Sequence, residues 1–222
     1  MTTEQELRSW ADKWLGNREI PEEFLQLTAL QNAGLSGGEE LSAIEAARPG
    51  RPGEDKGEVD ACMGHREDRT ELLEFLGVRI VGPRQAAFLA RSVLDDEKNA
   101  EAPHFAEVLS HFLPVAETDD SVLVYGYWLH PGESWPPPVI CVDDEGSFSQ
   151  PKGRNIVESL LCRRSDGAQG GDKFSFFAQW FRNLGFTVTA HTAADVHKRS
   201  LLKDPEDLEA EIFGRSMQKS AG

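Results

Sequence analysis

The chain has 222 residues, of which 39% are hydrophobic, and a formal net charge of −15. This length and apolar content suffice for a folded core, while the acidity argues against nucleic-acid and anionic-membrane partners, which require a basic face. We expect either a basic protein partner or a surplus of charge that serves only solubility. No apolar run is long enough to cross a membrane or to form the core of a signal peptide, which predicts a cytoplasmic location.

The N-terminal third is predicted to contain two helices and a long loop. Apolar residues recur at helical spacing over residues 3–15. A second helix begins at Pro21, with acidic residues in its first turn, and ends at residues 32–34. Residues 35–66 are rich in glycine, proline and charge, which indicates a loop that is either an insertion or a functional arm.

More helices and one short strand are predicted before the centre of the chain. The apolar pattern favours helices over residues 68–75, 83–94 and 105–112, and a strand over residues 77–81. Pro114 is expected to close the last of these helices, because proline lacks the amide hydrogen that a helix interior needs.

The central stretch, residues 121–149, predicts a sheet. Residues 122–129 and 138–142 are apolar, strand-like runs, and the three consecutive prolines at 136–138 belong to the connection between them or to the entry of the second strand. An acidic turn at residues 143–146 follows, and Phe148 is expected to start the next strand.

The C-terminal part is predicted to be mainly helical. In chain order we expect a helix at 155–162, a flexible link at 165–172, a helix at 174–183 ended by Gly185, a strand at 186–189, and terminal helices at 193–202 and 205–217. Helices followed by a block of strands and then by more helices indicate an α+β fold with a mainly antiparallel sheet.

The sequence shows no established catalytic, metal or cofactor motif. Cys62 and His65 have a zinc-like spacing, but no second pair of ligands lies near them in the sequence. Neither a nucleophile elbow nor a phosphate-binding glycine loop is present. We therefore predict no catalytic residue, no metal site and no cofactor.

Several polar and aromatic residues of the central stretch allow more than one interpretation. Asp143, Asp144 and Glu145 fit a solvated turn, although carboxylates can also form an acid/base pair or bind a divalent cation. Trp135 fits a buried sheet aromatic, but its glycine- and proline-rich surroundings also suit a contact for a partner protein. An alternative class of function is a hydrolase whose site is assembled from dispersed residues such as His130, Asp143 and Glu145.

The chain resembles the SUKH superfamily in two parts. The first is IPEEFL at residues 20–25 followed by QNAG at residues 31–34, which resembles the proline-led helix of that family. The second resembles the central strands and closing helix of the family, and consists of FLPVA at 112–116, YW at 127–128, PVI at 138–140, DEG at 144–146 and residues 156–161.

The resemblance implies an α+β fold with a twisted, mainly antiparallel sheet flanked by helices over residues 1–165. An acidic insertion would occupy about residues 35–68 of this domain. Residues 166–222 would form a helix-strand-helix extension packed on the same domain.

The resemblance also implies a non-enzymatic immunity protein that binds and neutralises a cognate toxin, often a nuclease, of a bacterial competition system. Nuclease toxins have basic grooves, so an acidic inhibitor gains association rate against them. The acidic segment 35–68 is one candidate contact. The other predicted partner-binding residues are Glu117, Asp119, Asp120, Trp135, Asp143, Asp144 and Glu145. A regulatory scaffold without a toxin partner would share these features.

Overall fold

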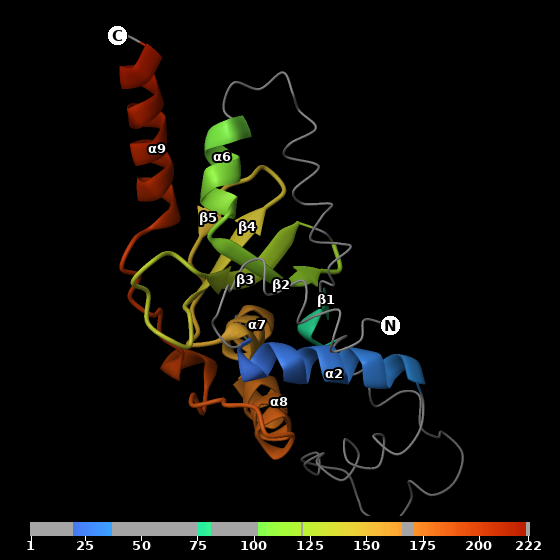
Figure 1. Cartoon of the computed structure of the whole chain (residues 1–222). Coiled ribbons are helices and arrows are strands. Elements are labelled where there is room, and N and C mark those ends of the chain that lie inside the picture. The colour runs from blue at the N-terminus through green and yellow to red at the C-terminus, as the bar shows by residue number, and fades with distance from the viewer. Residues whose placement is uncertain (1–19, 37–74, 81–101, 121, 166–170, 221–222) are drawn as a thin grey trace, which may run out of the picture. The chain divides into compact units, whose positions relative to one another are not determined.

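The protein has an α+β fold built around a five-stranded sheet that is not closed into a barrel (Figure 1). The computed structural model describes residues 20–36, 75–80, 102–120, 122–165 and 171–220. The described strands are β1 (Val78–Ile80), β2 (Phe112–Thr118), β3 (Leu123–Trp128), β4 (Val139–Asp143) and β5 (Phe148–Ser149). They lie in the order β1-β2-β3-β4-β5, and the pairs from β2 to β5 are antiparallel, which confirms the predicted fold class.

The described helices precede and follow the sheet in the sequence. They are α2 (Glu22–Ser36), α6 (Ala102–Leu109), α7 (Ile156–Ser165), α8 (Gly171–Asn183), the 3₁₀ helix η1 (Ala193–Asp195) and α9 (Pro205–Ser220). Among the described residues, no helix combines the length and apolar character needed to cross a membrane.

The chain divides into two compact units, and each is described by itself. The helical unit contains the described residues within 22–79 and 152–198, and therefore α2, α7, α8 and η1. The sheet unit contains the described residues within 80–151 and 199–220, together with residues 20–21, and therefore β2 to β5, α6 and α9. Helices α7 and α8, on either side of residue 165, belong to the same unit.

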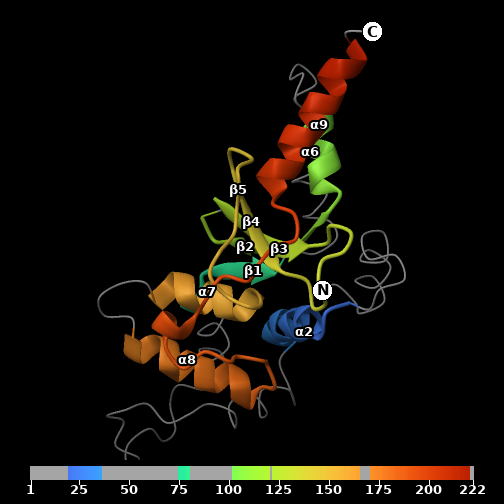
Figure 2. The same ribbon diagram turned by 90° about the vertical axis from the view of Figure 1, so that its left-hand side faces the viewer.

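In the sheet unit, α6 and α9 run alongside each other and pack on the sheet (Figures 1 and 2). The core between them consists of Phe105 and Val108 of α6, Leu208 and Ile212 of α9, and Phe112, Val124, Trp128, Ile140, Val142 and Phe148 of the strands. The strand residues of this core belong to one face, because their pairing register places them side by side. Burial of each large apolar side chain stabilises the unit by roughly 1.5–3 kcal/mol.

Gly126 of β3 makes room for an aromatic ring on this face. A Cβ atom at Gly126 would lie 2.5 Å from Cε2 of Phe112 and 2.3 Å from the carbonyl oxygen of Leu113. The glycine therefore allows the ring of Phe112 to lie directly over the backbone of the neighbouring strand.

The prediction that Phe112 ends a helix closed by Pro114 is wrong. Helix α6 ends at Leu109, and Phe112 is the first residue of β2. The pairing register with β3 shifts between Pro114 and Ala116, so one extra residue of β2 forms a bulge beside the proline. Proline is tolerated at a bulge because a ladder hydrogen bond is already missing there.

In the helical unit, α7 packs against α8 (Figure 2). The apolar spacing predicted for residues 174–183 forms a buried aromatic face, in which Phe177 stacks on Phe75 with ring centroids 3.6 Å apart. Gly185 ends this helix at a φ of 90°, as predicted. The amide of Gly185 donates to the carbonyl of Arg182, and the amide of Phe186 donates to that of Phe181, which is the Schellman arrangement.

The predicted strand at residues 186–189 is also wrong, although its side chains alternate as in a strand. Phe186, Val188 and Ala190 are buried, while Thr187 and Thr189 are exposed. No neighbouring strand pairs with this segment among the residues that the structure describes, because side chains bind its backbone instead. The side chain of Asn155 donates to the carbonyl of Thr187, and the side chain of Arg182 donates to the carbonyls of Val188 and Ala190. The amides of Thr189 and Ala190 donate to the carboxylate of Glu158.

Most other predicted elements of the described chain are confirmed, with shifted ends. The helix that begins at Pro21 continues through residues 32–34 to Ser36, and the predicted helix at residues 193–202 is only the short η1. The helices predicted at 3–15 and 83–94, the loop at 37–66, most of the helix at 68–75 and the link at 166–170 lie outside the described residues.

Candidate functional site

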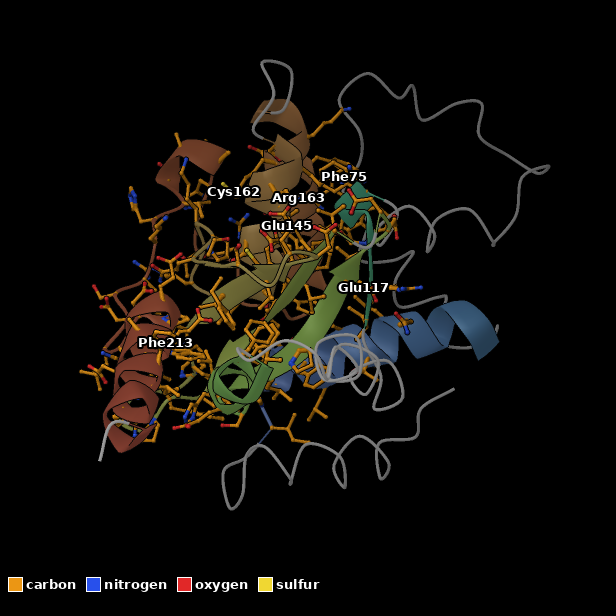
Figure 3. All side chains as sticks on the ribbon, turned by 90° about the horizontal axis from the view of Figure 1, so that it is seen from above. Phe75, Glu117, Glu145, Cys162, Arg163 and Phe213 are labelled. Carbon is orange, nitrogen blue, oxygen red and sulfur yellow. The ribbon has the colours of Figure 1, made fainter. Side chains whose placement is uncertain are left out.

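Six of the seven predicted contact residues lie at one end of the sheet, which we call the acidic end. Glu117 pairs with Val124, and Asp143 pairs with Leu123, so the β2–β3 turn and the β4–β5 turn are neighbours. Glu117 and Glu145, labelled in Figure 3, mark these two turns. The residues brought to this end are Glu117, Asp119, Asp120, Asp143, Asp144 and Glu145.

Two of these carboxylates organise the turns themselves. Oδ1 of Asp143 accepts hydrogen bonds from the amides of Glu145 (3.1 Å) and Ser147 (2.7 Å), and Gly146 adopts a positive φ of 85°. Oδ1 of Asp120 accepts from the hydroxyl of Thr118 (2.5 Å) and the amide of Val122 (3.2 Å). The interpretation of residues 143–146 as a turn is confirmed, because these contacts are those of a side chain that closes a turn.

Asp119, Asp144 and Glu145 are exposed at the acidic end. Among the described residues, no lysine or arginine forms an ion pair with these three side chains. They therefore project a negative potential into solvent, which acts at long range rather than through close contacts.

Trp135 lies at the opposite end of the sheet, in the connection between β3 and β4. This connection follows the pair Tyr127 and Val139, whereas Asp143 pairs with Leu123 four residues away along β3. At about 3.3 Å per residue, the two ends are roughly 13 Å apart along the strands. Trp135 and the acidic end therefore belong to opposite ends of the sheet.

Arg199 holds the loop that carries Trp135. One guanidinium nitrogen of Arg199, Nη1, donates to the carbonyl of Pro136 (2.5 Å), and Nη2 donates to Oγ of Ser134 (2.8 Å). The backbone carbonyl of Arg199 in turn accepts from the side chain of Gln150. The two residues that flank Trp135 are therefore fixed, while its own side chain is 46% exposed.

Glu133 also links the connection between β3 and β4 to the segment at residues 199–203. Its Oε1 atom accepts from the backbone amides of Leu202 (2.7 Å) and Lys203 (3.2 Å). The side chain of Leu202 lies over Gly132 and is 67% exposed. We call the exposed apolar residues of these two segments, Trp135 and Leu202, the Trp135 surface.

The structure does not bring His130, Asp143 and Glu145 together. His130 follows β3 at the end where Trp135 lies, while Asp143 and Glu145 lie at the acidic end. The ring of His130 instead faces His111, with centroids 5.3 Å apart, and stacks beside Trp128 at 6.1 Å. Sequence reasoning missed this pair, because it requires the pairing of Phe112 with Trp128 across β2 and β3.

A buried carboxylate in the helical unit was also missed. Glu158 of α7 is 1% exposed, and its two oxygens accept four hydrogen bonds: from the amides of Arg154, Thr189 and Ala190, and from the hydroxyl of Thr189. Burial raises the pKa of this carboxyl group, but the hydrogen bonds outweigh burial and hold the pKa below the ordinary glutamate value. Glu158 is therefore a charged structural group that holds residues 189–190 beside α7.

The start of α7 explains how Glu158 is positioned. Oδ1 of Asn155 accepts from the amide of Glu158 (2.9 Å), while Glu23 of α2 accepts from the amides of Ile156 (3.0 Å) and Val157 (2.8 Å). The first three amides of the helix are thus satisfied by the protein's own side chains. The spacing of Asn155 and Glu158 is a capping signature that the sequence contains.

The described residues include histidine, cysteine, aspartate and glutamate side chains, which are common metal ligands. Among them, no group of three or more histidine, cysteine, aspartate or glutamate side chains is placed to hold a metal ion. Comparison with models of known protein families, with curated proteins and with solved structures finds no match to this chain.

Proposed function

We propose that this protein is a non-enzymatic, immunity-type binding protein, SUKH-like in fold, that occludes a basic protein toxin in the cytoplasm. The observation that carries the proposal is the exposure of Trp135 on a loop that Arg199 and Glu133 hold in place. Tryptophan is enriched among the residues that dominate binding energy. A loop that is already ordered loses little conformational entropy when a partner binds it.

The two ends of the sheet would have separate roles in this binding. The Trp135 surface provides the apolar contact, which sets the rate of dissociation. The acidic end and the net charge of −15 attract a basic partner and raise the rate of association. A nuclease toxin would be such a partner, because its substrate groove must be basic.

Growth rescue tests the function directly. A candidate toxin, taken from the genes that neighbour the gene of this protein, is expressed in cells with and without the protein, and growth is measured. We expect growth only when the protein is present and a complex of the two proteins that can be isolated. No rescue and no complex, despite stable expression of both proteins, would overturn the proposal. A complex without rescue would show that the protein binds the toxin but does not neutralise it, and would overturn the proposed occlusion.

Trp135→Ala is expected to weaken the isolated complex by about 2 kcal/mol, or roughly thirtyfold, mainly through faster dissociation. The matched control is Val122→Ala, which removes an apolar side chain of similar exposure, 41%, near the acidic end and should leave affinity nearly unchanged. Surface plasmon resonance gives both rate constants. Equal losses in the two variants would show that the Trp135 surface is not the contact.

Removal of the negative charges at the acidic end should slow association of the complex rather than speed its dissociation. In the triple variant Asp119→Asn, Asp144→Asn, Glu145→Gln we expect a several-fold slower association at low salt, with dissociation unchanged. The difference from the unsubstituted protein should disappear as salt is added, because salt screens exposed charges. A loss that resides in the dissociation rate and persists at high salt would place the contact at the acidic end.

Arg199 should influence affinity through the order of the loop. Arg199→Met removes both hydrogen bonds that flank Trp135, and Arg199→Lys keeps the charge but cannot reproduce the two-pronged geometry. We expect both variants to bind about three- to tenfold more weakly, with faster amide exchange over residues 132–135. Normal affinity in both variants would show that this order does not contribute.

A further inference from the structure

Two histidine rings meet at the same end of the sheet as the Trp135 surface. His111 precedes β2 and His130 follows β3, and their ring centroids are 5.3 Å apart. Both rings lie beside the fully buried indole of Trp128, at 5.8 Å and 6.1 Å. The amide of Leu129 donates to the carbonyl of His111 (2.7 Å), which fixes the two chain segments relative to each other.

The indole of Trp128 connects this pair to α9. Its Nε1 atom donates to the carbonyl of Lys203 (2.8 Å), in the segment just before the helix. The same segment, residues 199–203, holds the Trp135 loop through Arg199 and through the backbone amides bound by Glu133. A change at the histidine pair therefore reaches both α9 and the Trp135 surface.

The charged groups that face the pair come from α6, α9 and the segment before α9. Among the described residues these are Glu107, which acts on His111, and Glu211, which acts on His130. Each carboxylate already has a cationic partner: Arg215 lies 3.3 Å from Glu107, and Lys203 lies 2.5 Å from Glu211.

The two rings have different surroundings. Nδ1 of His130 is buried without a hydrogen-bond partner, so a protonated ring would place an unpaired N–H donor there. For His111, burial lowers the pKa, the neighbouring His130 lowers it further, and Glu107 opposes both, with a net pKa below the ordinary histidine value. In an unfolded chain, a histidine ring takes up a proton near its ordinary pKa of 6.5.

We propose that His111 and His130 form a proton-sensitive switch: as neutral rings they hold α9 and residues 199–203 on the sheet, and their protonation loosens both. Two imidazolium rings at this separation repel each other. Glu107 and Glu211 attract the protonated rings and offset part of this repulsion, but Arg215 and Lys203 already pair with these two carboxylates. Acid would thereby dismantle the Trp135 surface, a consequence that rests on the proposed function, whereas the switch itself does not.

The direction of this pH dependence follows from the number of protons that each state binds. We call the state in which α9 and residues 199–203 lie on the sheet the closed state, and the state in which they are loosened the opened state. A histidine with a lowered pKa in the closed state binds fewer protons there than in the opened state. The closed state is therefore fully favoured above the ordinary pKa of 6.5 and loses this advantage as pH falls from 6.5 toward the lower pKa of the closed state.

Hydrogen exchange of the full chain tests the switch without any partner. Amide protection of residues 208–215 is measured at about pH 7.5 and about pH 5.5, with correction for the intrinsic exchange rate. We expect protection to fall about tenfold in the unsubstituted protein and less than about twofold in the double variant His111→Gln, His130→Gln, which cannot titrate there. The matched control His191→Gln, His197→Gln removes two exposed histidines of the helical unit and should behave like the unsubstituted protein.

An equal fall in protection in the His111/His130 double variant and the unsubstituted protein would overturn the proposal, as would no fall in the unsubstituted protein. If the double variant does not fold, a proton NMR titration of the unsubstituted protein decides instead. The ring signals of His111 should then shift at a lower pH than those of His191 and His197, together with signals of α9. Titration of His111 at or above the pH of the exposed histidines would refute the switch.

Discussion

Glu158→Ala is expected to destabilise the helical unit by about 4 kcal/mol, because it leaves buried donors without an acceptor. The carboxylate accepts four hydrogen bonds, and three of these donors belong to residues 189–190, which have no neighbouring strand among the described elements. Urea unfolding followed by far-UV circular dichroism measures the loss. Glu158→Gln should lower the free energy of unfolding by about 2 kcal/mol. Its amide oxygen can still accept a hydrogen bond, but its amide nitrogen is a donor and would face other donors.

The control for Glu158 is Glu145→Gln, a change of the same chemistry in an exposed turn. Its effect should lie within about 0.5 kcal/mol of zero, as for most surface substitutions. Similar small losses in the Glu145 and Glu158 variants would show that the buried carboxylate contributes little net stability.

The contribution of Glu158 should also depend on pH. Because its pKa in the folded protein lies below the ordinary value of 4.5, the folded state is favoured by the ionised group above that value. This contribution is lost as pH falls through the lower folded pKa. Acid unfolding should therefore be less steep in Glu158→Gln than in the unsubstituted protein, and equal steepness would contradict the assignment.

Gly153→Ala is expected to destabilise the same unit by about 4 kcal/mol through backbone strain and overpacking. Gly153 has a φ of 130°, a conformation that other residues rarely adopt. A Cβ atom there would lie 2.3 Å from Oγ and 2.6 Å from the amide nitrogen of Ser159, in the first part of α7. The helix backbone would have to move, together with the amide of Gly153 that donates to His197 O (3.1 Å).

Gly214→Ala gives a control with the opposite sign. Gly214 lies in α9, and a Cβ atom added there meets no atom within 4 Å. Alanine is favoured over glycine in a helix interior, so this substitution should stabilise α9 by about 0.5–1 kcal/mol. Amide exchange of α9 and thermal unfolding measure the gain. A loss in Gly214→Ala comparable to that in Gly153→Ala would show that the strain argument is not specific.

Local chemistry predicted much of the fold and failed where tertiary partners decide. The strands β3 and β4 and the helix α8 follow from apolar runs and from stop signals such as Gly185, all of which act within a few residues. The predicted helix end at Pro114 was wrong because proline can either follow a helix or occupy a bulge in a strand. Only the pairing with β3 distinguishes the two. The strand predicted at residues 186–189 was wrong because alternating apolar residues indicate alternating burial, which does not require a neighbouring strand.

The candidate site was predicted in its parts but not in its arrangement. The acidic turn at residues 143–146 and an exposed Trp135 were both recognised as alternatives in the sequence. Their separation could have been foreseen, because successive connections of an antiparallel sheet lie at alternate ends. The contacts of Arg199 and Glu133 could not, since each joins residues more than sixty positions apart.

The segment at residues 186–190 has a consequence for aggregation. Its alternating apolar side chains would suit a strand that recruits a second chain through free backbone groups. Asn155, Arg182 and Glu158 already occupy five of these groups, so the segment has few left to offer another copy. We therefore expect the loss of these three polar side chains to leave backbone groups open to edge-to-edge association, even in molecules that remain folded.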